Sequence, residues 1–273
     1  MAELRNVMGM PVLVDVREDA VAPVAVQAVF TWLAFVDETF STYRADSDIS
    51  RIGSGALAAR DAHPLVREVL AHCERVREQT DGYFDVRAGG VLDPSGLVKG
   101  WAVQRAGELI EATGARDYCV DAGGDLCLRG GPEPGRPWRV GVRHPHERDR
   151  LAAVLELTDA AVATSGAYER GEHIVDPHTG RPPEGAVAVT VVGPDLGTAD
   201  AYATAAFAMG EDGPAWTAGL EGYAAMTVLS GDRVLSTAGF VEHCAGASVA
   251  DSLGQRTRRH RRTSHVQHGE ERP

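Results

Sequence analysis

The chain has 273 residues, of which 44% are hydrophobic, and its formal net charge is −12 at pH 7. This length allows one large domain or two small ones with a full apolar core. The acidic balance argues against nonspecific binding to nucleic acid, so an anionic ligand would need a metal, a helix N-terminus or a local basic side chain.

Cysteine usage and hydropathy bear on the cellular compartment. The four cysteines form no Cys-x-x-Cys pair, which favours reduced core residues over a zinc site or a disulfide framework. The N-terminus shows no basic start followed by an apolar run, and no apolar stretch reaches the roughly 18 residues of a membrane span. We therefore expect a cytoplasmic protein without a membrane span.

Hydrophobic periodicity predicts the elements of the first half of the chain. Residues 10–16 are expected to form a strand and residues 21–39 a helix, followed by a polar loop over residues 40–52. A second helix is predicted over residues 64–80, because a proline suits the first turn of a helix. The glycine-rich segment 82–90 is predicted to be irregular.

The second half of the chain mixes strands and helices. A helix is expected from about Lys99 to Gly114, where the glycine would end it. Short helices are predicted at 198–209 and 214–220, and strands at 118–120, 126–128, 138–142, 151–157, 161–163, 187–192, 224–229 and 234–237. Because strands and helices do not alternate strictly, an α+β architecture is favoured over a doubly wound parallel sheet.

The composition changes near residue 254. Six arginines and two glutamates follow from Arg256 onward, so this tail carries +4 and the remainder of the chain −16. We predict one domain over residues 1–253 and a disordered Arg/His-rich tail over residues 254–273, because such a tail has too few apolar side chains to fold. An idle terminus is favoured over a nucleic-acid-binding tail.

Lys99 is the single lysine among 27 basic residues. An ammonium is a compact point charge, and the wide planar guanidinium of arginine does not replace it in a tight site. If a helix begins near Lys99, the amides of its first turn and its dipole would attract phosphate or carboxylate. The alternative is a surface lysine that was kept by chance.

Three further segments hold candidate functional residues. The glycines of Asp121-Ala-Gly-Gly-Asp125 allow either the close approach of a ligand or an ordinary tight turn between strands. His173 precedes a turn at Asp176-Pro177 and is either a general base near neutral pH or a structural residue.

The third segment is the alanine-rich helix predicted near residue 200. Thr198 is expected to cap this helix, which places Asp200 and Thr204 on one face. A carboxylate and a hydroxyl suit a hard cation such as Mg²⁺. The alternative is an aspartate that only complements the helix dipole.

The order of the motifs is more specific than any one motif. Between Met8 and about Gly210 they are Met8-Gly9, Phe40-Ser-Thr-Tyr43, Ser47-Asp-Ile-Ser50, Gly82-Tyr-Phe-Asp85, Gly96-Leu-Val-Lys-Gly100, Asp121-Ala-Gly-Gly-Asp125, Trp138-Arg-Val-Gly141 with Pro145, Thr164-Ser-Gly166, His173-Ile-Val-Asp-Pro-His-Thr-Gly180 and Ala199-Asp-Ala-Tyr-Ala-Thr204. In these motifs the chain resembles the ApbE family, the FAD:protein FMN transferases.

This resemblance implies a tunnelling-fold-like α+β domain with mixed or antiparallel sheets, flanking helices and a cleft for FAD. It implies a Mg²⁺-dependent enzyme that moves the FMN part of FAD to a threonine or serine hydroxyl of an acceptor flavoprotein and releases AMP. The implied metal ligands are Asp200, Thr204 and the backbone carbonyl of Gly96. The implied contacts to FAD are Met8, Thr42, Tyr43, Asp85, Lys99, Gly123, Gly124 and His173.

Catalysis on this reading must neutralise charge on a splitting pyrophosphate and take a proton from the acceptor hydroxyl. Lys99 and Asp200 are the candidates for the first task, directly and through the metal. His173 is the candidate base, with an aspartate beside the metal as the alternative.

The chain also departs from the family pattern. Asp85 and Lys99 are only 14 residues apart, where the family usually has a few dozen, so a wall or lid over the cofactor is expected to be shortened. Gly53 and Met10 stand where the family often has asparagine and threonine. Two alternatives therefore stay open: an FAD pyrophosphatase that yields AMP and FMN, and a non-catalytic FAD-binding protein.

Overall fold

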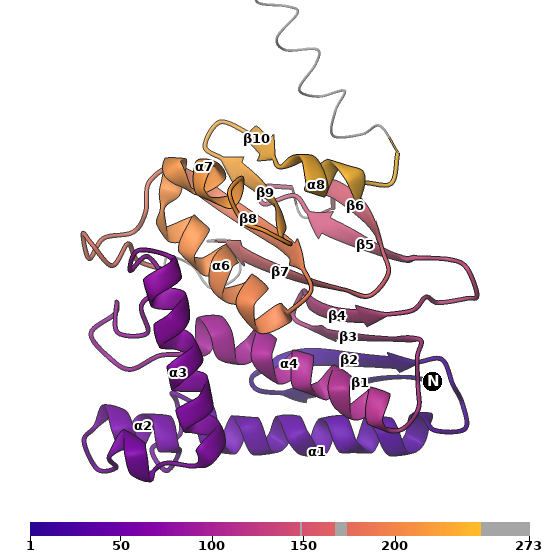
Figure 1. Cartoon of the computed structure of the whole chain (residues 1–273), viewed down its shortest axis with the longest axis horizontal. Helices are drawn as coiled ribbons and strands as arrows, with labels where there is room; N and C mark the ends of the chain where they lie inside the picture. Colours follow the sequence, from indigo (N-terminus) through magenta and orange to yellow (C-terminus); the bar gives the residue numbers. More distant parts are fainter. Residues whose placement is uncertain (148, 167–173, 247–273) are drawn as a thin grey trace, which may run out of the picture.

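The computed structural model describes residues 1–147, 149–166 and 174–246. Its largest element is an antiparallel sheet of eight strands in the order β1-β2-β3-β4-β7-β8-β9-β10 (Figure 1). The strands are β1 Ala2–Val7, β2 Met10–Val16, β3 Tyr118–Ala122, β4 Asp125–Arg129, β7 Ala160–Gly166, β8 Ala186–Gly193, β9 Ala224–Leu229 and β10 Arg233–Ser236. A separate hairpin pairs β5 (Trp138–Arg143) with β6 (Leu151–Leu157).

The two faces of the large sheet bury different partners. Along β2, alternate residues Val12, Val14 and Val16 are fully buried against helices, as the period of two along a strand requires. The opposite face packs against the β5–β6 hairpin and a short helix, α8 (Ala238–Glu242), whose Phe240 is fully buried. Each face therefore has its own apolar core.

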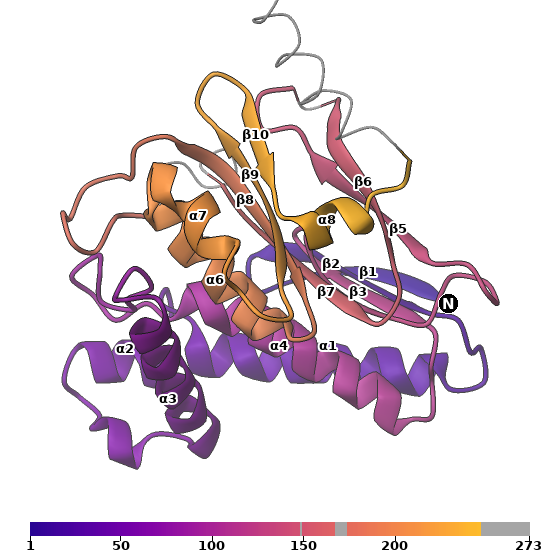
Figure 2. The ribbon, with the colours of Figure 1, turned by 45° about the horizontal axis from the view of Figure 1, so that its top comes forward.

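Helices cover the first face (Figures 1 and 2). They are α1 Ala22–Phe40, α2 Asp48–Gly53, α3 Pro64–Gln79, α4 Ser95–Ala112, α6 Leu196–Ala208 and α7 Gly213–Thr217, with single 3₁₀ turns at Ala59–Asp61 and Gly210–Asp212. The central pair is α4 and α6, and α1 packs on the side of α4. This pair matters for the site because it brings together residues about a hundred positions apart in sequence.

Two glycines explain how closely α4 and α6 approach. A Cβ atom on Gly100 would lie 2.3 Å from the carbonyl oxygen of Leu196, and one on Gly197 would lie 3.2 Å from the Cα of Trp101. A side chain at Gly100 would force the helices apart, since packed interiors do not absorb such an overlap, and one at Gly197 would make a tight contact.

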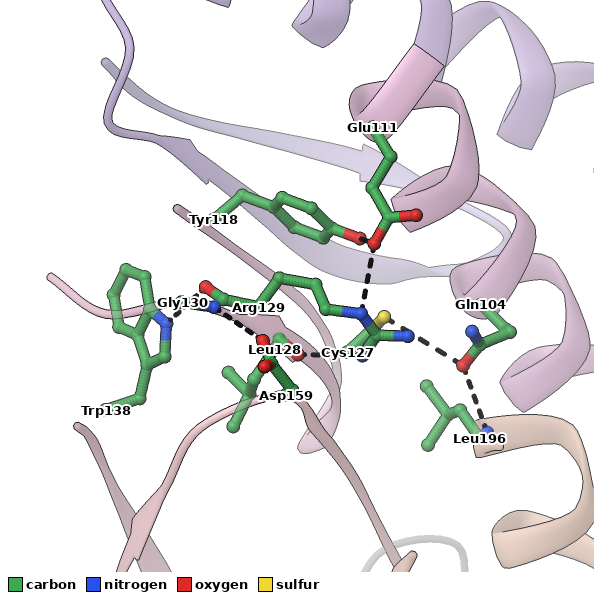
Figure 3. Close-up of polar contacts among 10 residues, drawn as sticks. All are labelled: Gln104, Glu111, Tyr118, Cys127, Leu128, Arg129, Gly130, Trp138, Asp159 and Leu196. Atoms are coloured by element: carbon green, nitrogen blue, oxygen red, sulfur yellow. Dashed lines mark hydrogen bonds and ion pairs between the residues drawn. The ribbon is translucent and has the colours of Figure 1, made fainter. Parts of the chain in front are cut away.

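A polar network holds the C-terminal half of α4 to the sheet (Figure 3). The Tyr118 hydroxyl and the Arg129 Nε both donate to Glu111 Oε1, each at 3.0 Å. Burial raises the pKa of Tyr118, so its hydroxyl stays protonated as a donor. Gln104 Oε1 accepts from the backbone amide of Leu196 at 3.2 Å, where α6 begins. The network thus ties α4 to the sheet and to α6.

The predicted α+β class with antiparallel sheets is confirmed, and several local predictions are wrong. The strand β1 was not predicted, and neither was α8. The segment predicted as a loop contains α2, which Ser47 caps by accepting from the amide of Ser50. The helix predicted from Lys99 begins at Ser95, and the next one begins at Leu196 with Asp195, not Thr198, as its cap.

The cysteine prediction is confirmed. All four cysteines are free, and Cys73, Cys119 and Cys127 are buried. Burial raises the pKa of the Cys73 thiol to about 12 and that of Cys127 to about 11, which leaves both as unreactive thiols. The tail predicted over residues 254–273 lies outside the described residues.

Candidate active site

A cavity of about 440 Å³ lies where the first turns of α4 meet α6 and the end of β7. The β1–β2 turn and the segment after α1 complete its wall. Its lining residues are Met8, Gly9, Met10, Val36, Asp37, Phe40, Ser41, Thr42, Tyr43, Ser95, Gly96, Val98, Lys99, Thr164, Ser165, Gly166, Asp200 and Thr204. The structure thus brings together seven of the predicted site residues: Met8, Thr42, Tyr43, Gly96, Lys99, Asp200 and Thr204.

Lys99 lies between two buried carboxylates. Its Nζ is 2.9 Å from Asp125 Oδ2 and 3.9 Å from Asp200 Oδ1. Asp125 is 1% exposed and Asp200 is 2% exposed, so both charges depend on the ammonium for compensation. The lysine predicted from its rarity is therefore part of a buried charge cluster, and the alternative of a surface lysine is wrong.

The helix-terminus interpretation of Lys99 is also wrong. Since α4 begins at Ser95, Lys99 lies in the second turn of the helix, and its backbone amide is not among the free ones. The amide of Ser95 donates instead to Asp93 Oδ1 at 2.9 Å. The lysine contributes through its side-chain charge.

Asp200 makes a second contact to α4. Its Oδ2 accepts from the backbone amide of Gly100 at 3.1 Å. That amide is the one that ordinarily donates to the carbonyl of Gly96, four residues earlier. A side-chain acceptor on the Gly100 amide therefore makes the Gly96 carbonyl oxygen more available to another partner.

Oxygen donors gather beside Asp200. Thr204 Oγ1 lies 3.3 Å from Ser165 Oγ, and a Cβ atom on Gly96 would lie 3.1 Å from the same Thr204 oxygen. A carboxylate, a hydroxyl and a carbonyl are hard ligands that suit Mg²⁺. In the described part of the chain no three His, Cys, Asp or Glu side chains are grouped to hold a metal, so an ion here would also need backbone oxygens and water.

The β1–β2 turn presents Met8 to the cavity. Met8 and Gly9 form a two-residue hairpin turn, since Val7 pairs with Met10, and both have positive φ angles (54° and 73°). Such turns favour asparagine or aspartate at the position that Met8 occupies. A methionine in this conformation breaks a local rule, as residues at functional sites often do.

Other predicted residues lie around this cavity. Gly123 and Gly124, both with positive φ, form the tight turn between β3 and β4, and they line a neighbouring cavity of about 620 Å³. Asp85 lines two further cavities, one of which also contacts Gly96 and Thr204. His173 lies outside the described residues.

Asp125 is the site residue that the sequence interpretation missed. It begins β4, and its Oδ1 accepts from the backbone amide of Thr164 on the neighbouring β7 at 3.2 Å. The motif Asp121-Ala-Gly-Gly-Asp125 contained the signal, because a charged residue that begins a buried strand needs a partner. The partner, Lys99, is 26 positions away and was not deducible from spacing.

The comparisons with known proteins now decide the family. The model of the ApbE family matches residues 8–93 and 87–227. The chain belongs to the ApbE family. Relatives named FAD:protein FMN transferase include one from Escherichia coli K12, 34% identical over 249 residues that cover 68% of this chain and 71% of the relative. One from Vibrio cholerae is 37% identical over 131 residues, 44% of this chain and 39% of the relative.

The match to two of these relatives is partial, since it spans 39% of the Vibrio cholerae protein and 37% of the Salmonella typhimurium protein. Solved structures support the fold over nearly the whole chain. The ApbE protein of Thermotoga maritima has a TM-score of 0.81 at 23% identity and covers 90% of this chain and 99% of its own. The flavinyl transferase ApbE of Pseudomonas stutzeri has a TM-score of 0.77 at 28% identity, covering 89% and 96%.

Among the described residues, no helix combines the length and the apolar character that crossing a membrane requires.

Proposed function

We propose that this member of the ApbE family is an FAD:protein FMN transferase. It moves the FMN part of FAD to a serine or threonine hydroxyl of an acceptor protein and releases AMP. The observation that carries the proposal is the placement of Lys99 between Asp125 and Asp200 in the wall of a cavity that Gly96 and Thr204 also line. Curated relatives with this name support it.

The bonds of the proposed reaction balance without an oxidant or reductant. The acceptor oxygen bonds to the phosphorus of the FMN half, and the bond from that phosphorus to the bridging oxygen breaks. The bridging oxygen leaves with AMP, and the hydroxyl proton passes to a base, for which we propose His173.

The chain's own groups would stabilise the charge that develops. Lys99 offers a positive charge held in place by two carboxylates, so little reorganisation is needed when phosphate oxygens become more negative. Asp200, Thr204 and the Gly96 carbonyl are the residues we propose to hold Mg²⁺. Bound there, the ion would supply Lewis-acid neutralisation of phosphate oxygens.

Product analysis tests the proposal against its two alternatives. The resemblance to the family implies an acceptor pattern Asp-x-x-(Ser/Thr)-(Gly/Ala)-Ala-(Ser/Thr), and Asp-Gly-Ala-Thr-Gly-Ala-Thr is one sequence that fits it. The protein is incubated with FAD and Mg²⁺, with and without a carrier domain that bears this sequence, and the flavins are separated by chromatography. We expect AMP in equal amount to fluorescent flavin on the carrier. AMP with free FMN in the absence of the carrier would mean a pyrophosphatase, and intact FAD retained by the protein would mean a binding role; either contradicts the proposal.

Two variants of Asp200 separate the role of its negative charge from the role of its hydrogen bond to the Gly100 amide. Asp200→Ala removes the carboxylate, and Asp200→Asn keeps an oxygen that can accept from the Gly100 amide. We expect both to lose Mg²⁺-dependent transfer, and Asp200→Asn to keep the unfolding midpoint closer to the wild-type value. Full transfer by Asp200→Ala at limiting Mg²⁺ would overturn the metal assignment.

A further inference from the structure

A second hollow lies on the opposite face of the large sheet from the helices. It is the cavity of about 620 Å³ that Gly123 and Gly124 border. Its floor is a row of side chains that the strand register places side by side, Leu4, Leu13, Asp121, Leu126 and Val162. Leu4 is 65% exposed, so part of this row is an apolar surface open to solvent.

One wall of this groove is the free edge of β5. Five consecutive residues, 139–143, line the groove, and no residue of β6 does among those described. In the described chain β5 pairs only with β6, so every second backbone amide and carbonyl along β5 points away from β6 without a strand partner. Such an edge accepts an extended peptide as an additional strand.

The β5 wall of the groove carries two arginines on an acidic protein. Val140 and Val142 point into the core, and the alternate residues Arg139 and Arg143 are exposed. Arg139 lies 3.8 Å from Glu156, and Arg143 is exposed. On the floor, Asp121 already accepts from the Gly124 amide at 2.8 Å. The two arginines outnumber the single aspartate of the lining, so the exposed side of β5 favours an acidic ligand over a basic one.

The groove adjoins the candidate active site at one residue. Thr164 of β7 lines both cavities, and its amide donates to Asp125, the partner of Lys99. A ligand that runs along β5 therefore reaches a residue that also lines the cavity proposed for FAD.

We propose that this groove binds the acceptor segment. The segment lies extended along the free edge of β5, with alternate side chains on the leucines of the floor and the others beside Arg139 and Arg143. Acidic side chains of the segment that point toward Arg139 and Arg143 pair with these arginines. The segment continues toward Thr164, where the serine or threonine hydroxyl of the acceptor meets the flavin phosphate. This inference rests on the proposed transferase function and names the partner of that site.

Charge reversal tests the groove. With the Asp-Gly-Ala-Thr-Gly-Ala-Thr carrier as acceptor, Arg139→Glu/Arg143→Glu is expected to raise the KM for the carrier by about tenfold or more. The KM for FAD and the affinity for FAD, followed by flavin fluorescence, are expected to stay within about twofold of wild type, a difference below about 0.5 kcal/mol. The matched control is Arg150→Glu/Arg233→Glu, which reverses two exposed arginines that do not line the groove.

A carrier in which the aspartate of the segment is replaced by lysine provides a rescue. It is expected to be a poor acceptor for the wild type and a better one for Arg139→Glu/Arg143→Glu, because the charges are exchanged. A general loss of folding in the variant would not produce this reversal.

The outcomes separate the two proposals. If the wild type transfers no flavin to any carrier, the proposed function fails. If the wild type transfers flavin and the charge-reversed variant keeps its KM for the carrier, the groove assignment fails alone. A raised KM for FAD with an unchanged KM for the carrier would also overturn it, since the groove would then bind the nucleotide.

Discussion

At the scale of single residues, the two carboxylates beside Lys99 explain why this position holds a lysine and not an arginine. Its ammonium is 2.9 Å from Asp125 and 3.9 Å from Asp200, both almost completely buried. A guanidinium is wider and would have to displace one of the carboxylates to keep both contacts. The singular lysine and the two aspartates therefore form one unit.

Replacing this lysine by arginine tests the unit. Lys99→Arg keeps the charge, and we expect it to lower the rate of FAD turnover by about 100-fold, the scale seen when one preorganised charge is misplaced. The rate of AMP release at saturating FAD is the measurement. Arg105→Lys, an exposed exchange on the same helix, serves as the control. Wild-type turnover in Lys99→Arg would contradict a specific role for the ammonium.

Asp125 is expected to matter for stability as well as for activity. Asp125→Asn keeps an oxygen for the Thr164 amide and removes the charge nearest to Lys99. We expect the free energy of unfolding to fall by about 1–3 kcal/mol, because a partly buried ammonium loses its closest counter-charge. Urea unfolding at pH 7 measures the change. An unchanged midpoint would show that Asp200 alone compensates Lys99.

At the scale of elements, the contact of α4 with α6 determines the site. The two helices approach through Gly100 and Gly197, and Gln104 accepts from the first amide of α6. Lys99 and Asp200 face one another only because the helix axes are this close. The site is thus a product of helix packing as much as of the residues it contains.

Adding one methyl group to this contact is expected to disturb it. In Gly100→Ala the new Cβ would lie 2.3 Å from the Leu196 carbonyl oxygen. We expect a loss of about 1–3 kcal/mol of stability from overpacking, together with a lower rate of FAD turnover.

Thermal unfolding and AMP release measure these two effects. Gly89→Ala is the matched control, since nothing lies within 4 Å of its added Cβ and its φ is not positive. If Gly100→Ala behaved like Gly89→Ala, the close approach of the helices would not be needed.

At the scale of the whole molecule, the large sheet has helices on one face and the β5–β6 hairpin on the other (Figure 2). The cavity with Lys99 lies among the helices, and the groove lies beside β5. Thr164 reaches both cavities because β7 lies in the middle of the sheet. In the proposed reaction, FAD and the acceptor segment would approach Thr164 from these two cavities.

The stability of the whole molecule is expected to depend on pH through His72. Burial lowers the pKa of His72 below its ordinary value of 6.5, and the nearby Asp195 opposes the shift only in part. A histidine whose pKa is lowered on folding is stabilising when neutral. Its contribution is present above pH 6.5 and is lost as the pH falls below that value toward the folded-state pKa.

Urea unfolding at pH 8 and pH 5.5 measures this contribution. We expect the wild type to lose more stability between the two values than His72→Gln, which has no titrating group at this position. His146→Gln, an exchange at an exposed site, is the control. Equal losses in the wild type and in His72→Gln would contradict the prediction.

The sequence by itself determined the type of most elements and the membership in a family. The apolar pattern of residues 10–16 predicted β2, helical spacing predicted α1, and a proline suited to a first helical turn predicted α3. The singular Lys99 and the spacing of Asp200 and Thr204 marked the site. These features are local, because periodicity and short motifs depend on neighbours a few residues apart.

Only the tertiary structure decided which distant residues meet. The pairing of Lys99 with Asp125, the start of α4 at Ser95 and the groove beside β5 all depend on packing between segments far apart in sequence. The strand β1 and the helix α2 escaped prediction because neither has a strong apolar pattern of its own. The six residues of β1 are held by pairing with β2, and α2 is a short helix with one buried residue, Ile49. Local sequence patterns determine whether a segment forms a helix or a strand, and packing in the shared core determines which side chains of distant segments come into contact.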